Sequence, residues 1–224
     1  MYRVKEAFYT LQGEGAQAGR AAVFCRFSKC NLWNGREADR ATAVCTFCDT
    51  DFVGTDGQNG GRFDTAATLA DHIAALWPGD RSDLAGGPRP YVVCTGGEPL
   101  LQLDEPLIAA FHERGFEVGV ETNGTLPAPK GIDWLCVSPK ADARVVIEAC
   151  DELKVVYPQP LAMPERFLSI RATHYFLSPM ASPVAPVAGT DPAKASNTRK
   201  AVEYCLQHPR WRLTIQMHKV VGID

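Results

Sequence analysis

Short apolar runs alternate along the chain with polar or glycine-containing segments. The runs Ala21–Phe27, Tyr91–Cys94 and Phe116–Val120 combine β-branched, aromatic and other apolar residues in the pattern of buried strands. Further strands are expected at Tyr2–Thr10, Trp134–Val137, Glu152–Val156, His174–Leu177 and Leu213–Gln216. Several runs end in polar residues, so the carboxyl ends of the strands are the expected place for chemistry.

Three segments have the period of amphipathic helices. Asp64 is the expected N-cap of a helix that runs through Trp77. A second helix is expected at Leu103–Arg114, with Gly115 as its stop. In the third, Asp191–His208, the residues expected to face inward are Ala201, Val202, Cys205 and Leu206.

The elements follow the order strand, polar strand end, and then helix or loop. This order predicts a parallel α/β sheet. The helices are too few for the eight complete strand–helix units of a closed barrel. A doubly wound open sheet is the alternative, but no Gly-x-Gly-x-x-Gly fingerprint follows any of the strands. The glycine-rich segment Val53–Phe63 is expected to be a loop.

Composition narrows the functional classes. The chain has 224 residues, of which 46% are hydrophobic and 22% charged, and its formal charge is −3. This length suits one domain, taken as residues 1–224. The charge argues against a broad nucleic-acid-binding surface but not against a small anionic substrate. No signal peptide or membrane-spanning run is visible, and a reducing compartment suits the cysteines, so we expect a cytoplasmic protein without a membrane partner.

Three of the eight cysteines form the pattern Cys-x14-Cys-x2-Cys at Cys30, Cys45 and Cys48. A structural zinc site normally has four ligands, so zinc needs a fourth that the sequence does not reveal. Three thiolates on a four-iron cluster, which is normally held by four, leave one iron open to a small molecule. A chance pair in a cysteine-containing chain is the third interpretation. No histidine lies nearby, since the first is His72.

Two other strands carry residues that point to chemistry: an arginine lies inside one, and two glycines follow the other. Arg26 lies inside the Ala21–Phe27 strand, where a guanidinium needs an anionic partner. That partner is either a neighbouring acidic side chain or a ligand carboxylate, which an arginine binds through two parallel hydrogen bonds. Cys25, which points to the opposite face, is the expected core thiol. After the strand at Tyr91–Cys94, two glycines permit either a tight turn or close approach of the backbone to a ligand.

Taken together, the motifs resemble one enzyme family. Cys-Asn-Leu-Trp at 30–33 and Cys-Thr-Phe-Cys-Asp-Thr at 45–50 are similar to radical S-adenosylmethionine (SAM) enzymes, and more narrowly to the 7-carboxy-7-deazaguanine synthases. Four more segments match that family: Leu11–Gly15, Thr95–Pro99, Glu121–Thr125 and Ser138–Lys140. One departure is the spacing of the first two cysteines, because most radical SAM enzymes have three intervening residues and this chain has fourteen.

The resemblance implies a fold, a reaction and partners. The fold is a partial, open parallel β/α barrel with few helices. The reaction is the lyase conversion of 6-carboxy-5,6,7,8-tetrahydropterin to 7-carboxy-7-deazaguanine with loss of ammonia, in queuosine biosynthesis, with SAM used catalytically. A [4Fe-4S] cluster, SAM and Mg²⁺ are the implied cofactors, and a flavodoxin-type electron donor and a second copy in a homodimer the implied partners. The alternatives are a glycyl-radical-enzyme-activating protein and a non-enzymatic zinc-binding module.

The resemblance also assigns residues. Cys30, Cys45 and Cys48 hold the cluster, and Thr50 holds Mg²⁺, although residue chemistry alone favours Asp49. The residues implied to contact SAM are Phe47, Asp49, Gly96, Gly97, Glu98, Ser138, Pro139, Lys140, Leu177, Ser178 and Pro179. Those implied to contact the pterin are Leu11, Gln12, Gly13, Glu14, Arg26, Thr95, Glu121 and Asp224.

Residues 31–44 form an insertion within the cysteine motif. Its eleven extra residues are not needed to shape the cluster, and closing the longer loop costs only about 1 kcal/mol of entropy. We expect Trp33 to anchor the insertion while its charged residues (Arg36, Glu37, Asp39 and Arg40) form a solvated face. The insertion lies beside the expected cluster, a position that suits contact with an electron donor. The alternative is a surface insertion that is tolerated without a function.

Overall fold

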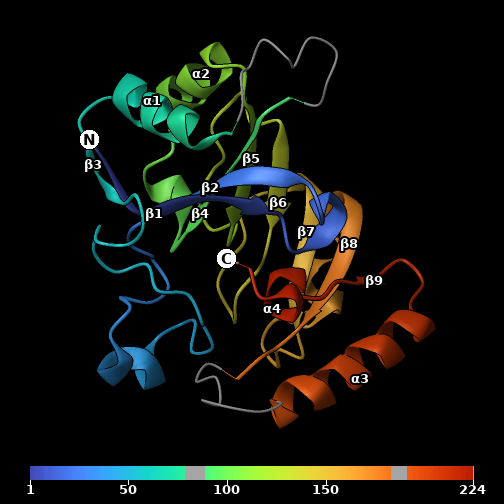
Figure 1. The fold of residues 1–224 in the computed structure, drawn as a ribbon. Coiled ribbons are helices and arrows are strands. Elements are labelled where there is room, and N and C mark those ends of the chain that lie inside the picture. The colour runs from blue at the N-terminus through green and yellow to red at the C-terminus, as the bar shows by residue number, and fades with distance from the viewer. Residues whose placement is uncertain (79–88, 183–190, 224) are drawn as a thin grey trace.

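A computed structural model describes residues 1–78, 89–182 and 191–223. The described residues form one nine-stranded sheet in the order β3-β1-β2-β4-β5-β6-β7-β8-β9 (Figure 1). Its strands are β1 (Tyr2–Leu11), β2 (Ala21–Phe27), β3 (Gly61–Phe63), β4 (Tyr91–Gly96), β5 (Glu117–Thr122), β6 (Trp134–Val137), β7 (Ala149–Tyr157), β8 (Arg171–Pro179) and β9 (Arg212–Leu213). Seven of the eight expected strands are present; of the expected Leu213–Gln216 only Leu213 is in a strand, because β9 is Arg212–Leu213. Strand β3 is an addition within the glycine-rich segment expected to be a loop.

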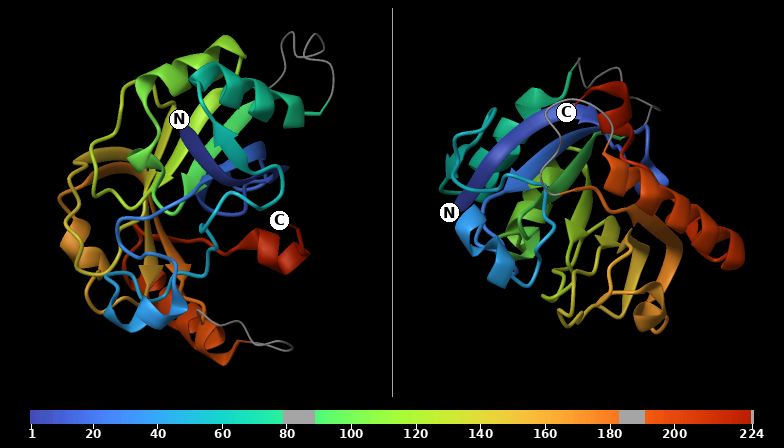
Figure 2. Two further views of the ribbon diagram at one scale, coloured as in Figure 1. Left: turned by 90° about the vertical axis from the view of Figure 1, so that its left-hand side faces the viewer. Right: turned by 90° about the horizontal axis from the view of Figure 1, so that it is seen from below.

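The pairing from β2 through β9 is parallel, as expected, but β1 pairs antiparallel with both β2 and β3. An all-parallel sheet is therefore wrong at this end. The connection between β1 and β2, residues 12–20, is too short for the crossover that a parallel pair requires. The sheet curves without closing, which confirms a partial, open barrel (Figure 2).

Helices cover only part of the outer surface, which confirms the expected low helix content. They are α1 (Ala66–Leu76), α2 (Glu105–Glu113), α3 (Pro192–Gln207) and the short α4 (Met217–Val221), with 3-10 turns at η1 (Gly15–Gln17), η2 (Glu37–Thr42), η4 (Pro99–Leu101) and η5 (Pro164–Phe167). The N-cap of α1 is Thr65 rather than Asp64, because the Thr65 hydroxyl accepts a hydrogen bond from Thr68 N at 3.1 Å. Helix α4 had no sequence signal.

The inward face of α3 differs from expectation. Ala201 is fully buried, but Val202 is 38% and Leu206 78% exposed. Ala201 and Cys205 lie four residues apart on one stripe of the helix, whereas Val202 and Leu206 lie on the neighbouring stripe. Because α3 packs beside β8 and β9 at the edge of the sheet, only a narrow stripe of it meets the core (Figure 1).

The main core lies between the sheet and the helices α1 and α2. A second core lies around β7, β8 and α3. Strand alternation sends adjacent side chains to opposite faces. In β2 the side chain of Cys25 is fully buried in the core, as expected, and that of Arg26 faces the concave side of the barrel. That concave side holds the polar strand ends.

Candidate active site

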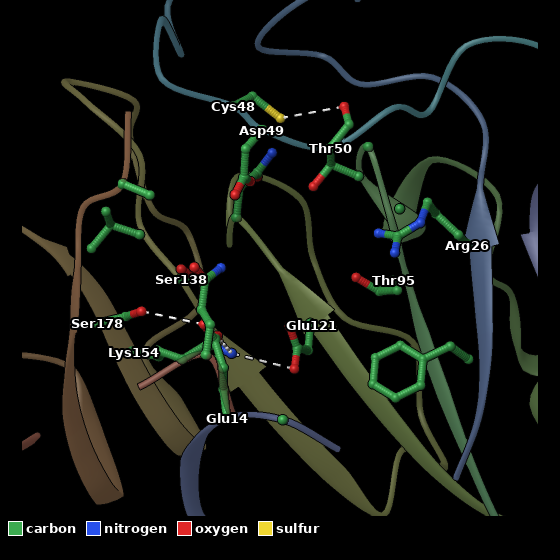
Figure 3. A pocket seen from close by; sticks show the side chains of 18 of the residues that line it. Glu14, Arg26, Cys48, Asp49, Thr50, Thr95, Glu121, Ser138, Lys154 and Ser178 are labelled. Carbon is green, nitrogen blue, oxygen red and sulfur yellow. Dashed lines mark hydrogen bonds and ion pairs between the residues drawn. The ribbon is translucent and has the colours of Figure 1, made fainter. Parts of the chain in front are cut away.

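A cavity of about 470 Å³ opens on the concave side, where the parallel strands end. Figure 3 shows polar side chains from successive strand ends facing it: Arg26, Thr95, Glu121, Ser138 and Ser178. Most residues predicted for the site line this cavity, namely Leu11, Gln12, Gly13, Glu14, Arg26, Cys30, Cys45, Phe47, Cys48, Asp49, Thr50, Thr95, Gly96, Gly97, Glu121, Ser138, Lys140, Ser178 and Pro179. The arrangement agrees with the rule that open parallel sheets carry ligands at their carboxyl edge.

The three motif cysteines lie together at one end of this cavity. Cys45 is 5% exposed, and the Leu32 amide donates a hydrogen bond to Cys30 Sγ at 3.4 Å. Burial raises the pKa of the Cys30 and Cys45 thiols, so a bound cation is needed to hold them as thiolates at neutral pH. The other five cysteines do not line the cavity, and none of the eight forms a disulfide.

The arrangement of the three cysteines in space bears on whether the site suits a zinc ion or an iron–sulfur cluster. Within the described residues, no group of three or more His, Cys, Asp or Glu side chains is close enough for a single ion, as a zinc site requires. A four-iron cluster is larger than an ion and holds its thiolates further apart. Three cysteines that line one cavity therefore suit a cluster that keeps one iron open to a small molecule.

The glycine loop after β4 packs directly on the Cys30 segment. A methyl group on Gly97 would lie 2.0 Å from the Lys29 carbonyl oxygen, and Gly96 has φ near +140°. Glu98 N donates to the same Lys29 oxygen at 2.9 Å. Only glycine permits this contact, so the two glycines fix the loop against the first cysteine.

Glu98, which is in the same loop, does not line the cavity. Its side chain is fully buried behind the cavity and accepts hydrogen bonds from Thr122 Oγ1 at 2.7 Å, Asn123 N at 2.8 Å and Leu100 N at 3.0 Å. Burial raises the pKa of Glu98, and these hydrogen bonds oppose the rise. It ties the ends of β4 and β5 together, and its part in binding SAM stays a prediction. Pro139 and the fully buried Leu177 likewise do not line the cavity.

The wall opposite the cysteines is built around a buried lysine. Lys154 Nζ lies 2.7 Å from Glu14 Oε2 and 3.3 Å from Glu121 Oε1 (Figure 3). Gln12 Nε2 donates to the same Glu121 oxygen at 2.9 Å. Burial works against the charge on Lys154, but Glu121 and Glu14 outweigh it and raise its pKa well above the ordinary value. Burial likewise opposes the charge of Glu14, but Lys154 lowers its pKa.

Arg26 lies on a third side of the cavity. Its Nε donates to Glu6 Oε1 at 2.7 Å, so one of the two predicted partners, an acidic neighbour, is present. Figure 3 shows the guanidinium group extending into the cavity next to Thr95. A guanidinium has five N–H donors, so the Glu6 bond leaves capacity for a ligand.

Asp49 and Thr50 follow the last cysteine. Asp49 forms an ion pair with Lys219 of α4. Although burial opposes it, this pairing lowers the pKa of Asp49. The Thr50 side chain faces the cavity beside Asp49 (Figure 3).

Several cavity residues were not predicted: Glu6, Phe8, Phe24, Asn123, Lys154, Gln216, His218 and Lys219. Lys154 carried a weaker form of the Arg26 signal, since it is the only cation of β7 but shares that strand with Asp151 and Glu152. The residues of α4 gave no signal, because tertiary contacts bring them to the cavity, among them the hydrogen bond that Met217 N donates to Gly13 O at 2.9 Å. Asp224 lies outside the described residues.

A cysteine triad, a glycine loop and a polar cavity at the open edge of a partial parallel barrel define the class of radical SAM enzymes. The chain matches no protein-family model. It is 61% identical to the 7-carboxy-7-deazaguanine synthase of Bordetella pertussis, over 99% of both chains, and 59% identical to that of Caulobacter vibrioides over the same shares. The chain therefore belongs to the 7-carboxy-7-deazaguanine synthase family.

One solved structure shows the same fold. The crystal structure of QueE from Escherichia coli matches with a TM-score of 0.65 and 23% identity, over 97% of this chain and 94% of that one. None of the relatives named here supports a glycyl-radical-activating or zinc-binding protein. In the described part of the chain, no helix has the length and apolar character needed to cross a membrane.

Proposed function

We propose that this enzyme converts 6-carboxy-5,6,7,8-tetrahydropterin to 7-carboxy-7-deazaguanine and ammonia, as its family membership and cavity support. The observation that carries the proposal is the shared cavity, with three thiols at one end and a polar wall built around Lys154 at the other. The carbon count of substrate and product is the same, and one nitrogen leaves as ammonia. The activity is that of a lyase.

The cluster and SAM belong at the cysteine end. When bound, they would supply the radical chemistry that removes a hydrogen atom from C6 of the substrate. Cys30, Cys45 and Cys48 would hold the cluster. The Gly96–Gly97 backbone, Phe47, Ser138, Lys140, Ser178 and Pro179 line the adjacent wall and would hold SAM. Lys140 Nζ donates to Ser138 Oγ at 2.6 Å, which fixes two of these polar groups relative to each other.

The pterin belongs at the lysine end. Its amide-like edge presents neighbouring donors and acceptors, which the Gln12 amide and the Glu14 and Glu121 carboxylates match. The ion pairs with Lys154 hold both carboxylates in place before the ligand arrives. The remaining donors of Arg26 would bind the substrate carboxylate at the other side. Leu11, Gly13 and Thr95 complete this wall.

We assign Mg²⁺ to Thr50 in the same proposal. Its hydroxyl oxygen faces the cavity and is a ligand suited to a hard cation. Asp49, the other oxygen donor at this position, is engaged by Lys219, which supports Thr50 as the metal-binding residue.

The proposed partners are a flavodoxin-type electron donor and a second copy of the chain. Thr46, between two of the cluster cysteines, is exposed, so electrons have a short path from the surface. The exposed apolar side chains Val202 and Leu206 of α3 support burial of this helix in a homodimer.

The test is anaerobic reconstitution with iron and sulfide, followed by turnover. The wild-type protein should bind about four irons per chain and form 7-carboxy-7-deazaguanine without net consumption of SAM. Substitution of Cys30, Cys45 or Cys48 by Ala should abolish iron binding, while Cys205→Ala, which lies outside the cavity, serves as the control. A colourless zinc protein, or a cluster that survives Cys30→Ala, would contradict the proposal.

A further inference from the structure

Arg40 lies within the insertion at residues 31–44, but its side chain is not on a solvated face. It is 15% exposed, and its Cζ lies 4.1 Å from the centre of the Trp33 ring. Trp33 is 8% exposed and packs edge-on against Phe52. The expectation that Trp33 anchors the insertion is therefore confirmed, and the expectation of a solvated Arg40 is wrong. Stacking on a buried indole fixes the plane of the guanidinium.

The two edges of the Arg40 guanidinium bind different segments. Nε and Nη2 donate to the two carboxylate oxygens of Glu37 at 2.7 and 2.8 Å. Nη1 donates to Cys48 O at 2.9 Å and to Thr46 O at 3.1 Å. One side chain thus connects the η2 turn to the backbone on both sides of Phe47. Arginine suits this task because its fork is planar and remains charged at all working pH values.

The insertion is otherwise closed on itself. Val44 N and Cys45 N both donate to Leu32 O, at 3.1 and 3.3 Å, so the chain returns beside its starting point. These bonds fix the segment up to Cys45. They do not reach Thr46 and Cys48, whose two carbonyl groups accept hydrogen bonds from Arg40.

We propose that Arg40 is a positioning residue for the iron–sulfur cluster: it holds the Cys45–Cys48 loop in shape and places a positive charge beside the thiolates. The inference rests on the proposed cluster site. A cluster with three thiolate ligands is anionic and becomes more so on reduction, so a nearby cation favours the reduced form. Glu37 offsets part of this charge, but it binds the Nε–Nη2 edge, while Nη1 faces the cysteine loop, and its carboxylate is 67% exposed.

This role differs from donor docking. In this role the insertion supports the cluster site directly, because the Arg40 side chain joins the insertion to the Cys45–Cys48 loop. Shortening residues 31–44 to three residues removes Arg40, so the shortened protein should lose its cluster faster with any reductant. Arg36 offers a matched control, because it is an exposed arginine in the same insertion, four residues away.

The test compares Arg40→Gln, Arg40→Lys and Arg36→Gln after anaerobic reconstitution. Two quantities are measured without substrate: the rate of iron loss to a chelator, and the midpoint potential of the cluster by redox titration followed by electron paramagnetic resonance. Arg40→Gln should lose iron several-fold faster and show a lower midpoint potential. Arg40→Lys should lose iron faster but keep a potential near wild type, because it retains the charge and loses the planar fork. Arg36→Gln should match wild type in both.

The outcomes separate the inference from the function on which it rests. A wild-type rate of iron loss in Arg40→Gln overturns the positioning role, and a wild-type midpoint potential in that variant overturns the electrostatic role. If Arg40→Gln retains no cluster while its circular dichroism is unchanged, the positioning role is supported. The midpoint potential of the cluster is then measured in Arg40→Lys. Failure of the wild-type protein to bind iron would instead contradict the proposed function.

Discussion

Lys154 Nζ and Glu14 Oε2 lie 2.7 Å apart at the closed end of the cavity, with side chains only 5% and 15% exposed. Glu14 follows β1 and Lys154 lies within β7, so the pair joins residues 140 positions apart in the sequence. A buried ion pair adds little net stability over an apolar pair, but removal of one partner leaves the other charge unpaired. The pair therefore orients groups in the site, and its disruption is costly.

We predict that Lys154→Met lowers the free energy of unfolding of the apoprotein by about 3–5 kcal/mol at pH 7, because Glu14 and Glu121 lose their shared cation. Chemical denaturation measures this. In the double variant with Glu14→Gln, part of the loss should be recovered, since one of the unpaired carboxylates is removed. Equal losses in the single and double variants would show that Glu14 and Lys154 are not coupled.

The same pair predicts a pH dependence. The pKa of Glu14 is below its usual 4.5, so its contribution is present above pH 4.5 and is lost as the pH falls through the lowered pKa. The pKa of Lys154 is above its usual 10.5, so its contribution is present below pH 10.5 and is lost as the pH rises through the raised pKa. In Lys154→Met, burial without the cation raises the pKa of Glu14, so the stability difference between wild type and the variant should shrink as the pH falls and the unpaired carboxyl becomes protonated. A difference that grows as the pH falls would be inconsistent with these directions.

Arg26→Lys should weaken pterin binding by about 1–3 kcal/mol, because lysine keeps the charge and loses the two-pronged geometry. Equilibrium binding to the SAM-loaded protein measures the effect, and SAM cleavage without pterin should persist. Arg20→Lys is the control, since Arg20 forms a comparable ion pair with Glu117 at 2.7 Å but does not line the cavity. Equal pterin affinity in wild type and Arg26→Lys would remove Arg26 from the substrate site.

Gly97→Ala should impair both stability and cluster uptake. The added methyl group would meet the Lys29 carbonyl oxygen at 2.0 Å, and this backbone atom precedes Cys30. Forcing the segments apart should cost about 1–3 kcal/mol of unfolding free energy. Gly61→Ala is the control, because its nearest contact there is an ordinary 3.4 Å to Phe63. Denaturation and iron content together test the claim, and full iron binding by Gly97→Ala at wild-type stability would refute it.

Thr50→Ala should lower turnover by roughly tenfold or more and weaken its response to added Mg²⁺, on the scale typical of damage to a metal's surroundings. Iron content should remain unchanged, because the substitution removes no thiol. Thr46→Ala, at an exposed position in the same loop and outside the cavity, should behave like wild type. If chelation does not affect turnover of the wild-type enzyme, the assignment of Mg²⁺ to Thr50 fails.

Much of the structure could be predicted from local sequence patterns. Apolar runs such as Ala21–Phe27 and Tyr91–Cys94 identified strands because burial imposes a composition that is visible in any single segment. The polar residues at the strand ends identified the open edge of the sheet as the site. The cysteine spacing limited the metal chemistry to a few interpretations, and the flanking motifs reduced these to one family.

Other features depend on contacts between distant segments, which no local pattern encodes. The antiparallel pairing of β1 follows from a short connection and from the neighbours that its edge meets. Glu98 belongs to a matching motif, yet folding places it behind the cavity as an acceptor for Thr122 and Asn123. The sequence alone therefore determined the strands, the site edge and the family, because these follow from residue type and spacing. Only the tertiary structure decided that Lys154 joins Glu14 and Glu121 and that Arg40 holds the cysteine loop, because each depends on how separately folded segments pack.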